Sequence, residues 1–200
     1  RNFIQGAGPR AIGVGYPEKL NLAFDAENVR LAMLWHGGFI DAARHWTGRG
    51  AGFEKPLGDK VLHLPEGPPL AVLQKADDAW PAQSAKKLGF HFDGYRLGSK
   101  QQPTFLYSWR DIKIEDEARP IGDQDVFAMH RKVVFRGGRS SPLPPGDGQA
   151  EGRLWFRAAR ADKIEELPGS TFKIDDRWTL KLKSAGKPIR RTQDSSDELL

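Results

Sequence analysis

The sequence predicts an all-β fold, a large two-sheet antiparallel β-sandwich (supersandwich-like) with long loops and little helix. Three observations lead to this class. Apolar residues recur at every second position through most of the chain, and helical periodicity is nearly absent. The 22 Gly and 14 Pro interrupt the alternating runs. We expect one β-sandwich domain at residues 1–189, followed by a polar C-terminal tail or linker at residues 190–200.

The strands are predicted in order along the chain. Leu20 to Phe24 and Val29 to Trp35 alternate around a three-residue turn and predict a hairpin. Phe90 to Leu97 and Thr104 to Trp109 flank a Gly-Ser turn and predict a second hairpin. Short helices are expected only at residues 39–46 and 82–88. The other expected strands are Ala11 to Tyr16, Gly38 to Asp41, Leu70 to Gln74, Ile112 to Glu115, Val126 to Arg136, Arg153 to Arg160, Phe172 to Ile174 and Trp178 to Leu182.

Composition excludes several functional classes. No cysteine is present, so the chain has no disulfide, thiol nucleophile, Cys-ligated metal or covalently attached c-type haem. The longest apolar stretches are about six residues, whereas a membrane span needs roughly 20. The net charge of +5 is spread evenly along the chain without a basic tail, so we expect no nucleic acid partner.

The run from Asp41 to Gly50 gathers an acid, two guanidinium groups, an imidazole and an indole before a Gly-rich stretch. One interpretation is a recognition surface, on which Arg44 and Arg49 bind an anion, Trp46 stacks, and His45 titrates or hydrogen-bonds. The other is structural: Asp41 pairs with Arg44 while Trp46 closes the end of the sandwich. Both interpretations stay open at this point.

Two further residues are candidate binding groups. Arg131 lies on the same strand face as the apolar Phe127 and Met129, so it must be paired with a carboxylate or lie at a bulge. Trp155 alternates with Arg153 and Arg157 on the outward face of its expected strand. That face either binds a partner or packs arginine stems over the indole.

No local pattern of catalytic or metal-binding residues is found. The five histidines lack the spacings of metal sites, and no serine has a neighbouring histidine. The acidic runs Glu115-Asp116-Glu117 and Asp175-Asp176 are placed at strand ends or turns, where carboxylates usually face water. We therefore expect no catalytic residues, no metal and no cofactor bound by this chain alone.

Several runs in the first 107 residues form a recognisable set. They are Arg1-Asn2-Phe3-Ile4, Gly8-Pro9-Arg10-Ala11-Ile12-Gly13-Val14-Gly15-Tyr16-Pro17, Asn21-Leu22-Ala23-Phe24-Asp25, Arg44-His45-Trp46-Thr47-Gly48-Arg49-Gly50, Pro56-Leu57-Gly58-Asp59, Gly94-Tyr95-Arg96-Leu97 and Pro103-Thr104-Phe105-Leu106-Tyr107. The set resembles a β-rich region found in large multidomain bacterial secreted c-type cytochrome proteins, and the resemblance covers most of residues 1–160.

The resemblance implies a periplasmic or secreted module that accompanies a haem domain in electron transfer. It carries over no catalytic residue, and the haem-attachment run of the whole proteins is missing here. The expected function is thus a non-catalytic interaction or scaffold module whose partner is a c-type cytochrome domain or subunit. The alternative is a carbohydrate-binding or carbohydrate-processing sandwich that uses Arg44, His45, Trp46 and Arg131.

Overall fold

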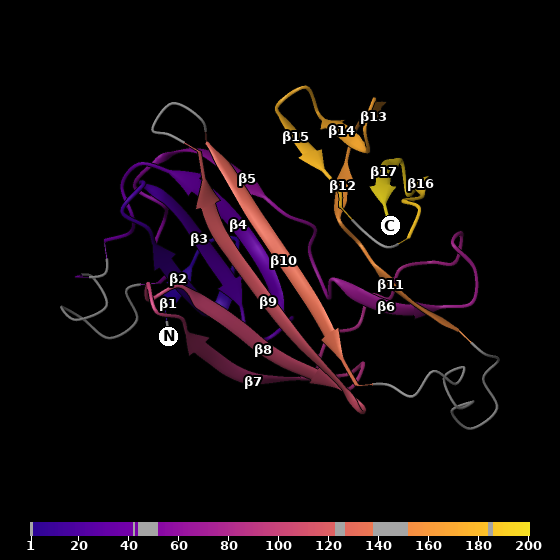
Figure 1. Cartoon of the computed structure of the whole chain (residues 1–200), viewed down its shortest axis with the longest axis horizontal. Coiled ribbons are helices and arrows are strands. Elements are labelled where there is room, and N and C mark those ends of the chain that lie inside the picture. Colours follow the sequence, from indigo (N-terminus) through magenta and orange to yellow (C-terminus); the bar gives the residue numbers. More distant parts are fainter. Residues whose placement is uncertain (1, 42, 44–51, 123–126, 138–151, 184–185) are drawn as a thin grey trace. The chain divides into compact units, whose positions relative to one another are not determined.

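The computed structural model describes residues 2–41, 43, 52–122, 127–137, 152–183 and 186–200, and these residues are nearly all β (Figure 1). The strands are β1 (Asn2–Ile4), β2 (Gly8–Gly15), β3 (Leu20–Asp25), β4 (Arg30–His36), β5 (Asp59–His63), β6 (Leu70–Leu73), β7 (Phe90–Leu97), β8 (Pro103–Trp109), β9 (Ile112–Ile121), β10 (Ala128–Arg136), β11 (Arg153–Phe156), β12 (Ala159–Ala161), β13 (Ile164–Leu167), β14 (Thr171–Ile174), β15 (Trp178–Lys181), β16 (Arg190–Gln193) and β17 (Ser196–Leu199).

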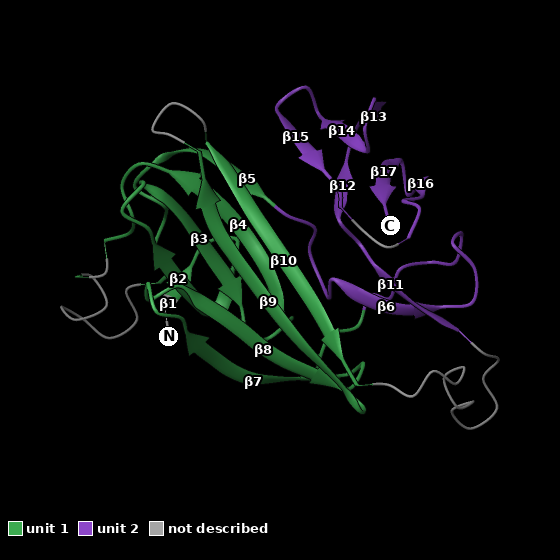
Figure 2. Cartoon of the chain, viewed as in Figure 1, with its two compact units in different colours: residues 1–63, 83–139 green, residues 64–82, 140–200 purple. Residues whose placement is uncertain are grey.

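The chain divides into two compact units, each made of two separate stretches of sequence (Figure 2). Unit 1 comprises Arg1–His63 and Gln83–Arg139, and unit 2 comprises Leu64–Ala82 and Ser140–Leu200. A single sandwich over residues 1–189 was expected instead. The sequence did not reveal the division because each unit is completed by residues distant along the chain.

Unit 1 contains two antiparallel sheets and confirms the sandwich prediction. One sheet has the order β1-β2-β3-β4-β5 and the other the order β10-β9-β8-β7. Both expected hairpins form, as β3–β4 and β7–β8, and each carries one register irregularity. Phe24 of β3 stacks on Phe105 of β8 with ring centroids 4.0 Å apart, so the interior between the sheets is aromatic.

The other face of the five-stranded sheet is also covered. Every residue of β3 is buried. On that second face Trp35 stacks on Phe39 at 5.8 Å, and its indole donates a hydrogen bond to the carbonyl of Gly38. A Cβ at Gly13 would lie only 2.9 Å from the Phe39 ring, so this close packing requires glycine. Both faces of β3 are therefore buried, and in β4 only Leu34 and His36 are partly exposed.

Unit 2 contains three small antiparallel sheets, with the orders β11-β6, β12-β17-β16 and β13-β14-β15. Its core is formed by Ala159, Ala161, Ile164, Phe172, Ile174 and Leu199. The expectation of a polar tail at residues 190–200 was wrong. These residues form the β16–β17 hairpin, in which Glu198 and Leu199 are fully buried, and the charged side chains that suggested a tail are paired inside the unit.

The short helix expected at residues 82–88 is replaced by hydrogen-bonded turns. The amide of Leu88 donates to the carbonyl of Ser84, and that of Phe90 to the carbonyl of Ala85. Half of the helix expected at residues 39–46 lies outside the described residues, and Ile40 forms a β-bridge with Pro56. Among the residues described, no helix has the length and apolar character needed to cross a bilayer.

Tyr16 links the two sheets of unit 1, and it should make the stability of the fold decrease at alkaline pH. Its hydroxyl donates to the carbonyl of Ala118, and burial, aided by Glu117 and Glu18, raises its pKa to about 12. The unfolded chain ionises this phenol at a lower pH, so stability is expected to fall as the pH rises from 10 towards 12. Urea denaturation at several pH values should show a shallower fall in Tyr16→Phe. An equal slope in the variant would contradict a role for Tyr16.

Candidate functional site

The first predicted binding group, Arg44, His45, Trp46 and Arg49, lies outside the described residues. The described backbone on either side of it is attached to unit 1. Ile40 bridges to Pro56, while the amide of Glu54 donates to the carbonyl of Phe3 and its carbonyl accepts from Gln5. Recognition or end-closure by these four residues therefore stays a prediction.

Arg131 is paired with a carboxylate, as one of the two sequence interpretations required. Its Nε and Nη2 donate to the two oxygens of Asp116 at 2.9 and 2.6 Å, and the hydroxyl of Tyr107 donates to the same carboxylate at 3.4 Å. Asp116 is only 1% exposed. The expectation that it lies at a strand end or turn was wrong, because it occupies the middle of β9 and faces inward.

The electrostatics of this pair indicate a structural role. Burial alone would lower the pKa of the Arg131 guanidinium, but the charge and hydrogen bonds of Asp116 raise it above its usual value. Burial, together with the Asp116 charge, raises the pKa of Tyr107 well above its usual value. Asp116 thus neutralises Arg131 inside the sandwich, which leaves Arg131 poorly suited to bind an external ligand.

Trp155 lies on β11 opposite Ala71 of β6 and is partly buried. Its indole Nε1 is buried without a hydrogen-bond partner among the described residues. Arg153 is exposed, but Arg157 is 5% exposed and lies just past the end of β11. The predicted outward row of Arg153, Trp155 and Arg157 is therefore wrong for Arg157.

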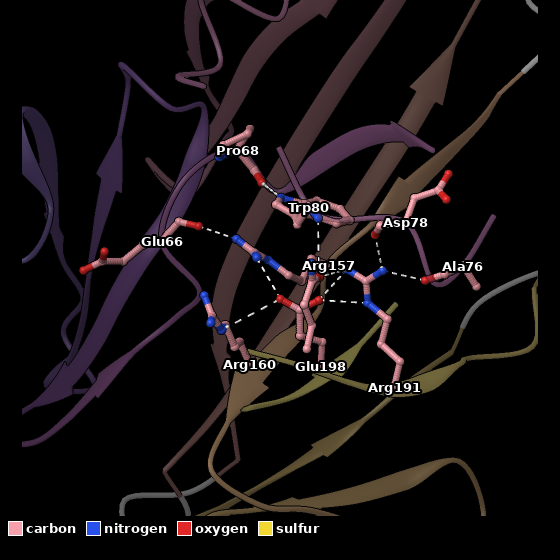
Figure 3. A network of polar contacts seen from close by, with 10 residues as sticks. Glu66, Pro68, Ala76, Asp78, Trp80, Arg157, Arg160, Arg191 and Glu198 are labelled. Carbon is pink, nitrogen blue, oxygen red and sulfur yellow. Dashed lines mark hydrogen bonds and ion pairs between the residues drawn. The ribbon is translucent and has the colours of Figure 1, made fainter. Parts of the chain in front are cut away.

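Arg157 belongs to a buried cluster that sequence reasoning missed (Figure 3). The carboxylate of Glu198 accepts from Arg157 at 2.9 Å and from Arg191 at 2.6 Å, and Arg160 lies 3.8 Å away. Glu198 and both closer arginine side chains are at most 5% exposed. We call Arg157, Arg191 and Glu198 the buried arginine cluster.

The buried arginine cluster connects the two sequence segments of unit 2. Arg191 donates to the carbonyls of Ala76 and Asp78, and Arg157 donates to the carbonyl of Glu66 (Figure 3). The Arg157 guanidinium also lies over the Trp80 ring, 4.7 Å from its centroid. Burial lowers the pKa of Arg157, against the opposing effect of Glu198. The cluster holds residues 64–82 against the C-terminal strands and is structural.

A surface of different character lies on the outward face of the four-stranded sheet. Successive strand residues point to opposite faces, and the inward positions of β8 and β9 hold buried Phe105, Tyr107, Ile114 and Asp116. The outward positions carry five cations. We call them the basic face; they are Arg96 of β7, Lys113 and Arg119 of β9, and Lys132 and Arg136 of β10.

Exposed apolar side chains lie on β7, one of the two edge strands of the same sheet. Strand β7 ends the sheet order, and its Tyr95 and Leu97 are 53% and 49% exposed. The Tyr95 ring lies in an edge-type contact with Phe105, at 6.5 Å between centroids. We call Tyr95 and Leu97 the β7 edge pair; Arg96 lies between them in the chain and points to the basic face.

Among the described residues no group of three His, Asp or Glu side chains is arranged to hold a metal ion. Comparison of the chain with models of protein families, with curated proteins and with solved structures found no match. The fold and its surfaces are therefore the basis for inferring what the chain does.

Proposed function

We propose that the chain is a non-catalytic interaction module that docks an extracytoplasmic c-type cytochrome domain or subunit. The observation that carries the proposal is the β7 edge pair. Exposed apolar side chains that lie together and are flanked by polar groups commonly mark protein contact sites. Tyrosine and arginine are also enriched at the energetic centres of protein interfaces.

Features of β7 favour docking of a different protein over pairing with another copy of this edge. A bulge separates Phe92 from Gly94, and Gly94 has a φ of 118°. Arg96, whose side chain is 60% exposed, adds a charge beside the apolar pair. Bulges and edge charges are devices that prevent strands from pairing edge to edge. A c-type cytochrome is proposed as the partner because of the sequence resemblance, and electron-transfer contacts need only a small interface.

Substitution of the β7 edge pair tests this function. In Tyr95→Ala/Leu97→Ala, binding to a panel of purified soluble c-type cytochromes should weaken at least roughly tenfold, because interface aromatics commonly contribute more than 1 kcal/mol each. Isothermal titration calorimetry measures the dissociation constants. Val72→Ala, which removes a similarly exposed apolar side chain in unit 2, should bind as the wild type does.

Equal affinity of the Tyr95→Ala/Leu97→Ala variant, with its fold verified by circular dichroism, would contradict docking through β7. The carbohydrate alternative predicts a ligand site at Trp46 and not on β7. Saturable binding to an oligosaccharide panel that is lost in Trp46→Ala would support a sugar site instead. We do not favour that alternative, because Asp116 already pairs with Arg131, one of its four residues.

A further inference from the structure

We propose that the basic face is an electrostatic docking surface, and that the protein it receives is acidic. The inference rests on the proposed function and specifies the chemistry of the partner. It is drawn from the outward face of β7, β8, β9 and β10, whereas the proposed function is drawn from the exposed edge of β7.

On the basic face the cationic side chains are more exposed to solvent than the carboxylates. The side chains of Arg96, Lys113 and Arg136 are 60%, 66% and 62% exposed. The carboxylate of Glu115 lies between two of them and is only 22% exposed. Its oxygens are 3.0 Å from Arg136 and 3.5 Å from Arg96. An approaching molecule therefore meets guanidinium and ammonium groups before it meets a carboxylate.

The cations of the basic face outnumber the carboxylates that accompany them. Three carboxylates share this face: Glu115, Glu117, which is 3.9 Å from Arg119, and Asp93, which is 3.4 Å from Lys113. The hydrogen bond from Arg136 keeps the pKa of Glu115 below its usual value. Lys132 is exposed and lies opposite Glu117 in the β9–β10 register, so Lys132 and Arg119 share a single carboxylate. A partner with surface carboxylates would complement this uncompensated charge.

The charge of the whole unit has the same sign. By sequence, unit 1 has 19 basic and 13 acidic residues, a net charge of +6, whereas unit 2 has 12 basic and 13 acidic residues, a net charge of −1. Summed charge produces a field that guides oppositely charged molecules during encounter. An acidic partner is therefore attracted to the unit that carries both the basic face and the β7 edge pair.

The face suits a protein better than a nucleic acid. Single-stranded nucleic acids need exposed aromatic rings on which bases stack. The aromatic residues of β8, Phe105, Tyr107 and Trp109, occupy inward positions and are buried, and the exposed Tyr95 of β7 is not on the basic face, because it lies opposite Phe105. A phosphate backbone carries closely spaced negative charges and would also be repelled by the intervening Glu115, Glu117 and Asp93. Separate carboxylates on a protein surface can avoid those positions.

The test measures binding of the whole chain to purified c-type cytochromes of acidic and of basic surface charge by isothermal titration calorimetry at several salt concentrations. We expect the acidic cytochromes to bind more tightly. Affinity should fall roughly tenfold between about 0.02 M and 0.2 M salt, as screening shortens the range of the attraction. Lys113→Glu/Lys132→Glu should weaken binding at least as much. The control, Lys86→Glu/Lys87→Glu, makes the same charge change in exposed residues of unit 1 outside the face.

The possible outcomes separate a failure of the electrostatic surface from a failure of the interaction module. Binding that is insensitive to salt and to Lys113→Glu/Lys132→Glu, but lost in Tyr95→Ala/Leu97→Ala, overturns the electrostatic surface and leaves the interaction module. Equal weakening by the control pair overturns a localised face. Equal or tighter binding of a DNA duplex or a heparin oligosaccharide, lost in Lys113→Glu/Lys132→Glu, overturns the choice of a protein partner. Absence of binding to every cytochrome overturns both proposals.

Discussion

Glu198→Ala is expected to destabilise unit 2 by about 3–5 kcal/mol, the usual cost of removing one partner from a buried ion pair. The substitution leaves Arg157 and Arg191 in the interior without their shared carboxylate. It also releases the side chains that hold the Glu66, Ala76 and Asp78 carbonyls. Residues 64–82 should consequently detach from the C-terminal strands. Urea denaturation followed by tryptophan fluorescence measures the loss, since Trp80, Trp155 and Trp178 all belong to unit 2.

A second variant keeps this prediction testable if Glu198→Ala does not fold. Glu198→Gln retains the shape and a hydrogen-bond acceptor but removes the charge, so its loss should be smaller than that of the alanine variant. Glu166→Ala is the control, because Glu166 is an exposed carboxylate of β13 in the same unit and its removal should change stability by less than about 0.5 kcal/mol. If Glu198→Ala behaves like this control, the buried arginine cluster does not hold unit 2 together.

Asp116→Ala should cause a loss of similar size in unit 1. The substitution leaves the Arg131 guanidinium, whose side chain is 18% exposed, without its bidentate partner. It also removes the acceptor of the Tyr107 hydroxyl. The expected cost is about 3–5 kcal/mol, measured by urea denaturation with the fluorescence of Trp35 and Trp109 as the signal.

A double variant tests whether the stability lost in Asp116→Ala can be recovered, and a surface variant serves as the control. In the double variant Asp116→Leu/Arg131→Met, apolar side chains replace the pair and should recover most of the loss, since a buried ion pair is often no more stable than well-packed apolar residues. Asp93→Ala removes an exposed carboxylate 3.4 Å from Lys113 and should cost no more than about 1 kcal/mol. A double variant as unstable as Asp116→Ala would show that the loss in Asp116→Ala does not come from leaving Arg131 unpaired.

The fold class could be predicted because alternation is a local property of the sequence. The hairpins β3–β4 and β7–β8 have strong period-two patterns and short connections, so both were expected within one or two residues of their bounds. The division into two units could not be predicted in this way. It depends on pairings such as β6 with β11, which are separated by about 80 residues of chain and have no common local signal.

For Arg131, the sequence predicts that a carboxylate partner is needed but does not identify it. Its position on an apolar strand face predicted that a carboxylate must lie nearby, and one does. The identity of that carboxylate depends on the β9–β10 register, in which Arg131 lies opposite Ala118 and Asp116 lies opposite Val133. The sequence does not specify this register, so Asp116 was taken for a water-facing residue.

The buried arginine cluster was missed for a related reason. Residues 190–198 are strongly polar, and a polar end of a chain usually indicates a tail. The buried face of the β16–β17 hairpin carries charged side chains, because Arg191 and Glu198 lie opposite each other on it. One signal was available: charged residues at matching positions on both sides of the Asp194-Ser195 turn indicate a hairpin with a cross-strand ion pair.

Amide hydrogen exchange of the chain, alone and with a bound acidic c-type cytochrome, tests most directly whether this protein is a docking module. We expect slower exchange in the complex in β7, β9 and β10, with unit 2 unchanged. Unchanged exchange in β7, with slower exchange only in residues 64–82 and 152–200, would contradict it.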